Sequence, residues 1–522
     1  MASPQVRAQE ARRVVDRYVG YLVSPALKKK LVSSNSVVEG AKISAGRVQS
    51  VAVKLLVELE HTIANFKPIE HFGVRAHMEH GGVSFWTDWD FKVLPDFPEG
   101  ERLWKDRVTA EFVAQSATRL ELIDASNTTK NNKPLPPLTT SDLVKSANRL
   151  FRFSTKKAMD LAQKLFEVGL ITYHRTDSPT MSDDFVATLR HYATTNGFSI
   201  PDQFRVYRAS GDAQEGHECC RVTDIENNQP PEITDEGQRK LYQMIWQRTL
   251  ACQLADEVVV VSQLRFCSPT HYQFVSKTSR QTFAGWRQLI PAAKKPKDDE
   301  QGSVPEVTVG DQLPVSNAEL QVKATKPPSR LMERNLVSEL EKRGIGRPST
   351  YANIISTILN RTYAEYSPKG QIVPTALGFV MCAALDNRFG FMDYQYTASI
   401  ESLLDRIAAG QQEYLPIVAG VYEQTQQELQ WFTNAELSLP SEHFSEAFSL
   451  SEKSAKSTGR SGKESTPKAK KKSDAPPLGS PCSADACSGT RIERQFKGGK
   501  SDGKRYLGCT GFPDCKQFNW LD

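Results

Sequence analysis

Helix-like and strand-like blocks alternate along this chain in the order helix, sheet, helix, sheet, helix. Apolar residues repeat at helical spacing in 8–27 and 44–63, and short alternating runs typical of strands begin near residue 69. Helical spacing returns after residue 139, strand-like sequence at 257–322, and 333–430 is again mainly helical. Because like blocks are separated in sequence, we expect distant segments to close into the same domains.

Length and charge divide the chain further. Its 522 residues predict several domains, and 39% hydrophobic and 24% charged content are typical of folded proteins. The net charge of +5 equals that of the stretch 452–479 alone, which holds eight basic and three acidic residues. This Ser/Lys/Pro/Gly-rich sequence predicts a disordered basic linker over 436–478. It either attracts polyphosphate or serves only as a solubilising tether.

Neither a membrane segment nor a secretory leader is expected. No apolar run approaches the ~20 residues that cross a bilayer. The first residues, MASPQVRAQEARR, hold no apolar core of a signal peptide. These features predict a cytoplasmic protein without membrane contact.

Tyr173 is the most informative single position. It ends a strand-like run, Leu170–Tyr173, beside a polar turn, and this geometry projects a hydroxyl into a cleft. Arg175 would point the same way and bind a phosphate oxygen, whereas His174 would face the other side and is a poor candidate base. Taken alone, the pattern is weak and more often marks a buried strand tyrosine beside a surface arginine.

The surrounding motifs decide between these interpretations. The segment GLITYHRTDS at 169–178 resembles the active-site motif of type IA DNA topoisomerases, closest to the bacterial topoisomerase I branch. Further segments resemble that family in the same order: ARRVVDRYVG at 11–20, SAGRVQS at 44–50, the weaker AQEGHE at 213–218 and LVSELEKRGIGRPSTY at 336–351. The resemblance covers nearly the whole chain.

The resemblance implies roles for the matched residues. Tyr173 would attack a phosphodiester to form a 5′-phosphotyrosine bond, and Arg175 would position the phosphate. The residues that would bind or approach DNA are Arg12, Arg13, Asp16, Arg17, Ser44, Gly46, Arg47 and Gln49, with His217 supporting the active site. Arg347 lies in a family motif, and its role is left open between packing and DNA contact. The chain has no Gly-x-x-x-x-Gly-Lys-[Ser/Thr] phosphate loop, in agreement with chemistry that needs no ATP.

One part of the family pattern is not found. Its TOPRIM domain supplies a glutamate and an Asp-x-Asp cluster for Mg²⁺, and this chain begins almost where that domain would end. Asp88 and Asp90 share the spacing but lie in strand-like sequence, where surface carboxylates are expected. We therefore expect DNA binding with poor cleavage by this chain alone. A truncated gene, a deliberately shortened chain and a split enzyme with a TOPRIM chain in trans remain as explanations.

Cysteines fall into two groups. Five are scattered and predict buried free thiols, whereas Cys482, Cys487, Cys509 and Cys515 crowd near the C-terminus. Their two-by-two spacing suits tetrahedral Zn²⁺, and the second half resembles the family's C-terminal zinc ribbon. Two disulfides are the alternative. Aromatic and basic residues between these cysteines would bind single-stranded DNA or pack a small core.

The expected fold is therefore a multidomain α+β type IA topoisomerase arch with a C-terminal zinc ribbon. The domains are a helical DNA-binding domain (1–68 and 325–435), a β-rich arch (69–132 and 258–324), a catalytic-tyrosine domain (133–257), the linker (436–478) and the zinc ribbon (479–522).

The expected function follows from the same resemblance. It is ATP-independent breakage, passage and rejoining of single-stranded DNA, which relaxes negative supercoils, by a monomer acting on single strands and negatively supercoiled duplex. The alternative is a single-stranded DNA-binding fragment without activity. The cleavage-site preference and the biological pathway do not follow from the sequence.

Overall fold

The computed structural model describes residues 3–208, 218–290, 307–443, 445–449, 488, 490–495, 505–510 and 518–520. The chain divides into two compact units, Met1–Ala455 and Lys456–Asp522. His217, Cys482, Cys487 and Cys515, to which the sequence assigned roles, lie outside the described residues.

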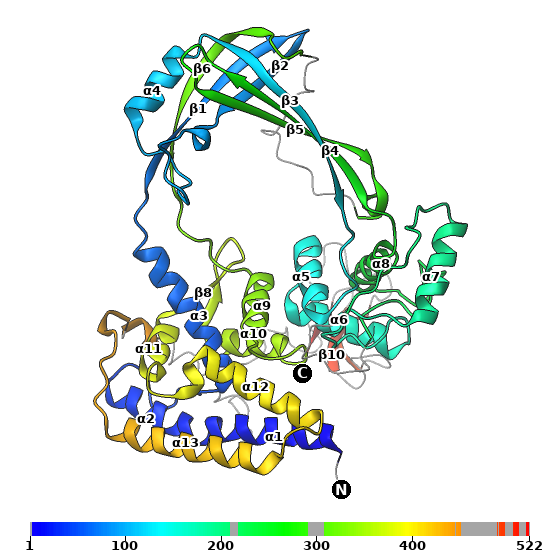
Figure 1. Cartoon of the computed structure of the whole chain (residues 1–522). Coiled ribbons are helices and arrows are strands. Elements are labelled where there is room, and N and C mark those ends of the chain that lie inside the picture. Colours follow the sequence, from blue (N-terminus) through cyan, green and yellow to red (C-terminus); the bar gives the residue numbers. More distant parts are fainter. Residues whose placement is uncertain are drawn as a thin grey trace. The chain divides into compact units, whose positions relative to one another are not determined.

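A closed antiparallel barrel joins the helical parts of the first unit (Figure 1). Its strand order is β1-β2-β5-β4-β3-β6, with β6 pairing back to β1. Alternate side chains of β1, from Phe72 to Met78, point into the barrel core, because successive residues of a strand face opposite sides. The strands are β1 (Glu70–His80), β2 (Val83–Trp89), β3 (Arg119–Asn132), β4 (Glu257–Cys267), β5 (Gln273–Phe283) and β6 (Gln312–Ala324), and α4 (Arg107–Ser116) packs on β1 and β6.

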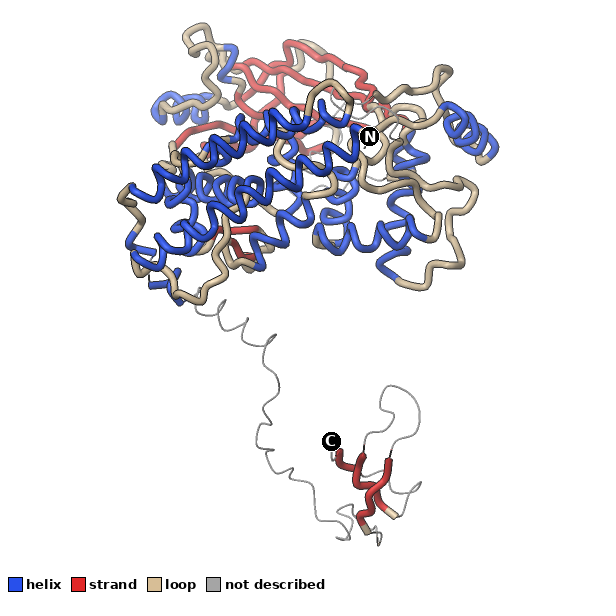
Figure 2. Tube along the Cα trace, turned by 90° about the horizontal axis from the view of Figure 1, so that it is seen from below, coloured by secondary structure: helices blue, strands red, loops and turns tan. Residues whose placement is uncertain are grey.

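One helical group combines both ends of the first unit. Figures 1 and 2 show its long helices α1 and α13 side by side, and α12 also packs on α1. Apolar residues of these three helices form a separate small core that includes Ala11, Val15 and Leu404. The group contains α1 (Pro4–Tyr18), a π-helical turn (Val19–Val23), α2 (Ser24–Ser33), α3 (Arg47–Ala64), α9 (Glu333–Lys342), α10 (Tyr351–Asn360), β7 (Ala364–Tyr366), β8 (Ile372–Pro374), α11 (Ala376–Leu385), α12 (Tyr394–Ala408) and α13 (Tyr414–Asn434).

The second helical group carries Tyr173 and consists of α5 (Thr140–Phe151), α6 (Thr155–Glu167), α7 (Asp183–Thr195) and α8 (Glu236–Ala251). Its α5 packs on α9 and its α6 on α10, so the two groups share one continuous apolar core. Short 3₁₀ turns complete the unit at Phe91–Val93, Gly285–Gln288, Gly390–Met392 and Ser441–His443.

The strand predicted at Leu170–Tyr173 is wrong. Only Ile171 pairs, through an isolated bridge to Val222. The next ladder bond would run from the Arg221 N–H to the Thr172 carbonyl, but the Arg221 N–H donates to the Thr172 hydroxyl at 2.9 Å. Because the Cys219 N–H also donates elsewhere, to the Thr180 carbonyl, the ladder ends after this bridge. The five scattered cysteines are free thiols, and four of them are buried, as predicted.

The described part of the second unit is a three-stranded antiparallel sheet. Its order is β11-β10-β9, from β9 (Arg491–Gln495), β10 (Arg505–Cys509) and β11 (Phe518–Trp520). Cys509 ends β10 and is buried. Since the other three candidate ligands lie outside the described residues, the zinc ribbon stays a prediction.

Candidate active site

Side chains alternate between exposed and buried along the segment that carries Tyr173. Tyr173, Arg175 and Asp177 are exposed, whereas His174 and the two residues at 176 and 178 are buried. The segment is extended enough to keep the two-residue period of a strand without belonging to a sheet. Three chemically different groups, a phenol, a guanidinium and a carboxylate, therefore share its exposed side.

These three side chains line a pocket of about 340 Å³. Arg12 of α1 and Arg347, which precedes α10, contribute cations from the other helical group. The pocket thus joins residues that lie more than 300 positions apart in the sequence and unites the predicted Tyr173, Arg175 and Arg12. The remaining lining residues are Gln5, Ala8, Gln9, Pro348, Ser349, Leu404, Asp405 and Ala408.

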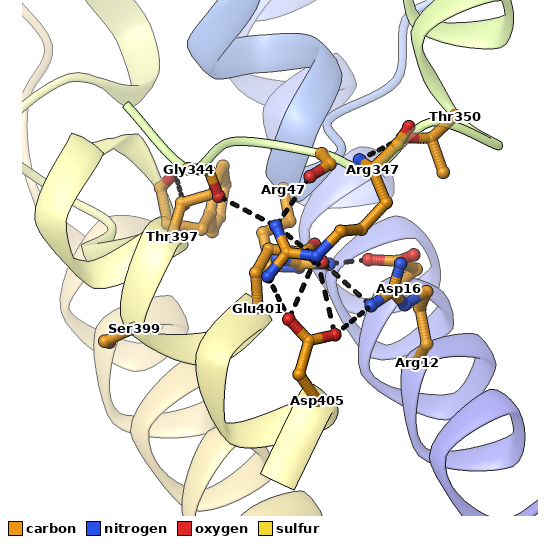
Figure 3. Close-up of polar contacts among 12 residues, drawn as sticks. Arg12, Asp16, Arg47, Gly344, Arg347, Thr350, Thr397, Ser399, Glu401 and Asp405 are labelled. Carbon is orange, nitrogen blue, oxygen red and sulfur yellow. Dashed lines mark hydrogen bonds and ion pairs between the residues drawn. The ribbon is translucent and has the colours of Figure 1, made fainter. Parts of the chain in front are cut away.

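Three of the residues that line the pocket, Arg12, Arg347 and Asp405, belong to a network of ion pairs (Figure 3). Glu401 of α12, whose side chain is 1% exposed, lies 2.6 Å from Arg47 and 2.9 Å from Arg12. Asp405, one helical turn further on, pairs with Arg347 and lies 3.6 Å from Arg12. Burial alone would raise the pKa of Glu401, but the surrounding arginines hold it below its ordinary value, so its carboxylate is charged at neutral pH.

Arg47 has a different position from the one expected. It was expected to approach DNA, yet its side chain is 1% exposed and is held between Glu401 and Asp16, with the Asp16 carboxylate 3.1 Å away. Because its side chain is buried and its Nε and one Nη bind these two carboxylates, Arg47 is not available to a phosphate in this structure. Its role here is to fix α3 against α1 and α12.

The other predicted DNA-binding residues divide by exposure. Arg13 and Arg17 are exposed on α1, one turn apart, and among the described residues neither forms an ion pair with a carboxylate. Ser44, Gly46 and Gln49 are half-buried around the start of α3, where the Gln49 amide donates to the Ser44 hydroxyl at 3.3 Å. None of these five lines the pocket with Tyr173.

His174 packs beneath the tyrosine and carries no charge at neutral pH. It is fully buried, and its ring lies 5.6 Å from the Tyr173 ring and 6.1 Å from that of Phe166. Neither ring nitrogen has a hydrogen-bond partner among the described residues. Burial, with the nearby Arg175 charge, lowers the pKa of His174 to about 4. With so low a pKa, the His174 ring is a weak base and is poorly suited to accept the proton of the tyrosine.

The pocket and the ion-pair network beside it contain groups that the sequence did not reveal. Asp177 continues the two-residue alternation from Tyr173 and could have been found by extending that pattern. Asp405 and Glu401 gave no such signal, because their arginine partners lie on other elements and are brought to them only by the tertiary fold.

The described residues do not provide a metal site. Among them no group of three or more His, Cys, Asp or Glu side chains is placed to hold a metal ion. Asp88 and Asp90 instead pair with Arg75 at 3.0 Å and Arg265 at 3.2 Å. In the pocket, Asp405 is engaged by Arg347 and Arg12. The described residues therefore do not fit a magnesium site.

Among the helices that the structure describes, none combines the length and the hydrophobicity of a membrane span.

Comparison with known proteins agrees with this architecture. The family model described as DNA topoisomerase matches residues 2–419. A plasmid DNA topoisomerase I of Xylella fastidiosa is 36% identical over 81% of this chain and 64% of its own length, and DNA topoisomerase 1 of Vibrio cholerae is 36% identical over 79% and 46%. DNA topoisomerase 1 of Aquifex aeolicus is 33% identical, with 79% of this chain and 73% of its own length covered.

A solved structure has the same fold. Full-length topoisomerase I from Thermotoga maritima superposes with a TM-score of 0.69 at 26% identity, covering 83% of this chain and 70% of its own. The chain thus spans between about half and three quarters of the length of the relatives it matches.

Proposed function

Because the chain belongs to the type IA family of DNA topoisomerases, we propose that it breaks and rejoins one DNA strand through Tyr173 and thereby relaxes negative supercoils. The observation that supports this most directly is the pocket that places the exposed tyrosine beside Arg175, Arg12 and Arg347. A phosphate entering it would meet a nucleophile together with cations from both helical groups.

The chemistry is a transesterification. The Tyr173 oxygen attacks the phosphorus, a phosphotyrosine bond to the 5′ side forms, and the bond to the 3′ oxygen breaks. The phenol proton is lost, and the 3′ oxygen gains one and leaves as a hydroxyl. Since one phosphodiester replaces another, the bond energy is conserved and no nucleotide is consumed. Reversal by the 3′ hydroxyl restores the strand.

Arg175 is the group best suited to the developing charge. It is exposed on the same side as Tyr173, and among the described residues it forms no ion pair with a carboxylate. Arg12 and Arg347 are partly neutralised by Glu401 and Asp405. A free guanidinium forms two parallel hydrogen bonds to phosphate oxygens, and such preorganised donors stabilise a transition state more than mobile solvent does.

Each of the two helical groups would hold one part of the cut strand. The 5′ end would stay on the tyrosine group, and the exposed face of α1, with Arg13 and Arg17, would hold the neighbouring single strand. Passage of a second strand then requires the groups to separate at the packing of α5 on α9 and α6 on α10, while the barrel keeps them joined.

Two metal ions complete the proposal. Magnesium would lower the cost of charge build-up during cleavage, and its ligands would come from a TOPRIM domain, on this chain's own polypeptide or in trans. Zinc would be held by Cys482, Cys487, Cys509 and Cys515 in the second unit.

A covalent-adduct assay tests the proposed function. The purified chain is incubated with Mg²⁺ and a labelled single strand, with and without a TOPRIM fragment of a relative, and then denatured. Protein linked to the 5′ phosphate supports the proposal, and an adduct that needs the added fragment supports a split arrangement. DNA binding without an adduct in either case contradicts it and favours the alternative, a non-enzymatic single-stranded DNA-binding protein.

A further inference from the structure

Three successive hydroxyl residues at the start of α5 have three different partners. Thr139 caps the helix by accepting the Asp142 N–H at 3.2 Å, and Ser141 donates to Glu341 of α9 at 2.5 Å. Thr140, between them, is 1% exposed and turns toward the tyrosine segment. It is the residue of the three whose hydroxyl touches the candidate active site.

Thr140 holds both peptide groups that flank Arg175. Its hydroxyl oxygen accepts the Thr176 N–H at 2.8 Å. Its single proton is donated to the His174 carbonyl at 2.7 Å, the nearer of two acceptors, the other being the Thr176 carbonyl at 3.0 Å. The first bond fixes the peptide after Arg175, and the second fixes the peptide before it. The Thr140 backbone adds an N–H donated to the Thr176 carbonyl at 2.8 Å.

These bonds replace the sheet that this segment lacks. On the other side of Tyr173, the Thr172 N–H donates to the Arg221 carbonyl at 2.8 Å and its hydroxyl to the Cys219 carbonyl at 2.6 Å. Tyr173 and Arg175 therefore stand on a short span of backbone anchored at Thr172 and again at Thr140. Between these anchors lie Arg175 and the two peptide groups that the Thr140 hydroxyl binds.

We propose that Thr140 is a positioning residue, whose buried hydroxyl sets the direction of Arg175 and, through the His174 carbonyl, of Tyr173 toward the scissile phosphate. The proposal rests on the proposed function of Tyr173. Thr140 does not line the pocket and touches no reacting atom, so it acts only through the backbone that it fixes.

Three variants separate positioning from general stability. Thr140→Val keeps the shape of the side chain and removes the hydroxyl, whereas Thr140→Ser keeps the hydroxyl. Thr425→Val is the matched control, because Thr425 is also buried and donates its hydroxyl to the Val421 carbonyl at 2.7 Å within α13. Each variant is made in the full chain.

The rate of adduct formation is measured under the condition in which the wild-type chain forms its adduct, together with the dissociation constant for a single strand. Thr140→Val is expected to slow cleavage roughly tenfold to a hundredfold, since small misplacements of reacting groups have effects of this size. Its dissociation constant stays within about twofold, because the exposed cations of α1 are untouched. Thr140→Ser recovers most of the rate, and Thr425→Val matches the wild type. Wild-type cleavage by Thr140→Val, or equal losses in the Ser and Val variants, overturns the proposal.

Amide hydrogen exchange provides a readout that needs no activity. Peptides covering 172–178 should exchange faster in Thr140→Val than in Thr140→Ser, and unchanged exchange overturns the proposal. If the wild-type chain forms no adduct, the proposed function fails, and exchange still decides whether Thr140 fixes the segment.

Discussion

The carboxylate of Glu401 lies 2.6 Å from the guanidinium of Arg47, and both side chains are 1% exposed. The two residues are 354 positions apart and come from α12 and α3. A buried charge without its partner is costly, so each fixes the place of the other. Arg12 pairs with Glu401, Arg347 pairs with Asp405 one turn further along α12, and both arginines line the pocket. The network therefore couples the packing of the helices to the candidate active site.

Replacing Glu401 with Gln should destabilise the chain strongly. The variant keeps the volume but leaves Arg47 without its buried anion, and we expect a loss of about 3 kcal/mol in the free energy of unfolding. Urea denaturation followed by tryptophan fluorescence measures it. Glu111→Gln is the control, since Glu111 forms a solvent-exposed pair with Arg107 and its loss should change the free energy of unfolding little. Equal effects of the two substitutions would refute the structural role of the network.

His174 should make stability depend on pH in mildly acid solution. In the unfolded chain it binds a proton near pH 6.5, but in the fold its pKa is lowered to about 4. Between these values the unfolded state binds more protons, so stability is complete above pH 6.5 and declines as the pH falls toward 4, by roughly 3 kcal/mol in all. The difference between the wild type and His174→Phe, followed by denaturation from pH 7 to 4, should show this slope. The exposed His191→Gln should not change it, and an equal slope in His174→Phe would contradict the account.

Arg13 and Arg17 should contribute to DNA affinity in a salt-dependent way. Each exposed guanidinium that neutralises a phosphate of a single strand adds about 0.7 to the slope of log affinity against log salt. Arg13→Ala and Arg17→Ala should each lower the slope by about that amount, measured by fluorescence anisotropy over a salt series. Arg107→Ala, on α4, serves as the control and should leave the slope unchanged. A wild-type slope in both α1 variants would exclude this face from the DNA path.

Glu333 should link the two helical groups. Its carboxylate, buried at the start of α9, accepts the Thr155 N–H at the start of α6 and the Tyr366 hydroxyl. Burial, together with this carboxylate, raises the pKa of Tyr366. Glu333→Ala leaves these donors without an acceptor and should lower the free energy of unfolding by about 1–3 kcal/mol.

Hydrogen exchange of the first turn of α6 should rise in the same variant. Glu339→Ala, which removes a carboxylate paired with Lys342 and Arg343 on its own helix, is the control. If α6 exchanged no faster in Glu333→Ala than in this control, the carboxylate would not be what joins the groups.

Local periodicity was enough to predict much of this architecture. The stripe from Val48 to Ile63 predicts a helix where α3 lies, and the alternation around Tyr173 places Arg175 beside it and His174 beneath it. Both are short-range properties, set by 3.6 residues per helical turn and two per strand repeat.

What escaped prediction depends on distant partners. Arg47 begins a helix, as a DNA-binding residue would, and only the fold shows that Asp16 and Glu401 bind its guanidinium. The expected strand at Leu170–Tyr173 failed because its neighbours donate their backbone N–H groups elsewhere. Such competition for hydrogen bonds is settled by tertiary contacts and leaves no trace in local sequence.

The central claim is that the oxygen of Tyr173 becomes covalently bound to DNA. The most direct test is to trap the adduct formed on a short single strand, digest the protein and locate the attached nucleotide by tandem mass spectrometry. We predict that it is found on the phenol oxygen of Tyr173 through a 5′ phosphate, and that Tyr173→Phe binds the strand with the wild-type dissociation constant but forms no adduct. A nucleotide attached to another residue, or an adduct that persists in Tyr173→Phe, would contradict the account.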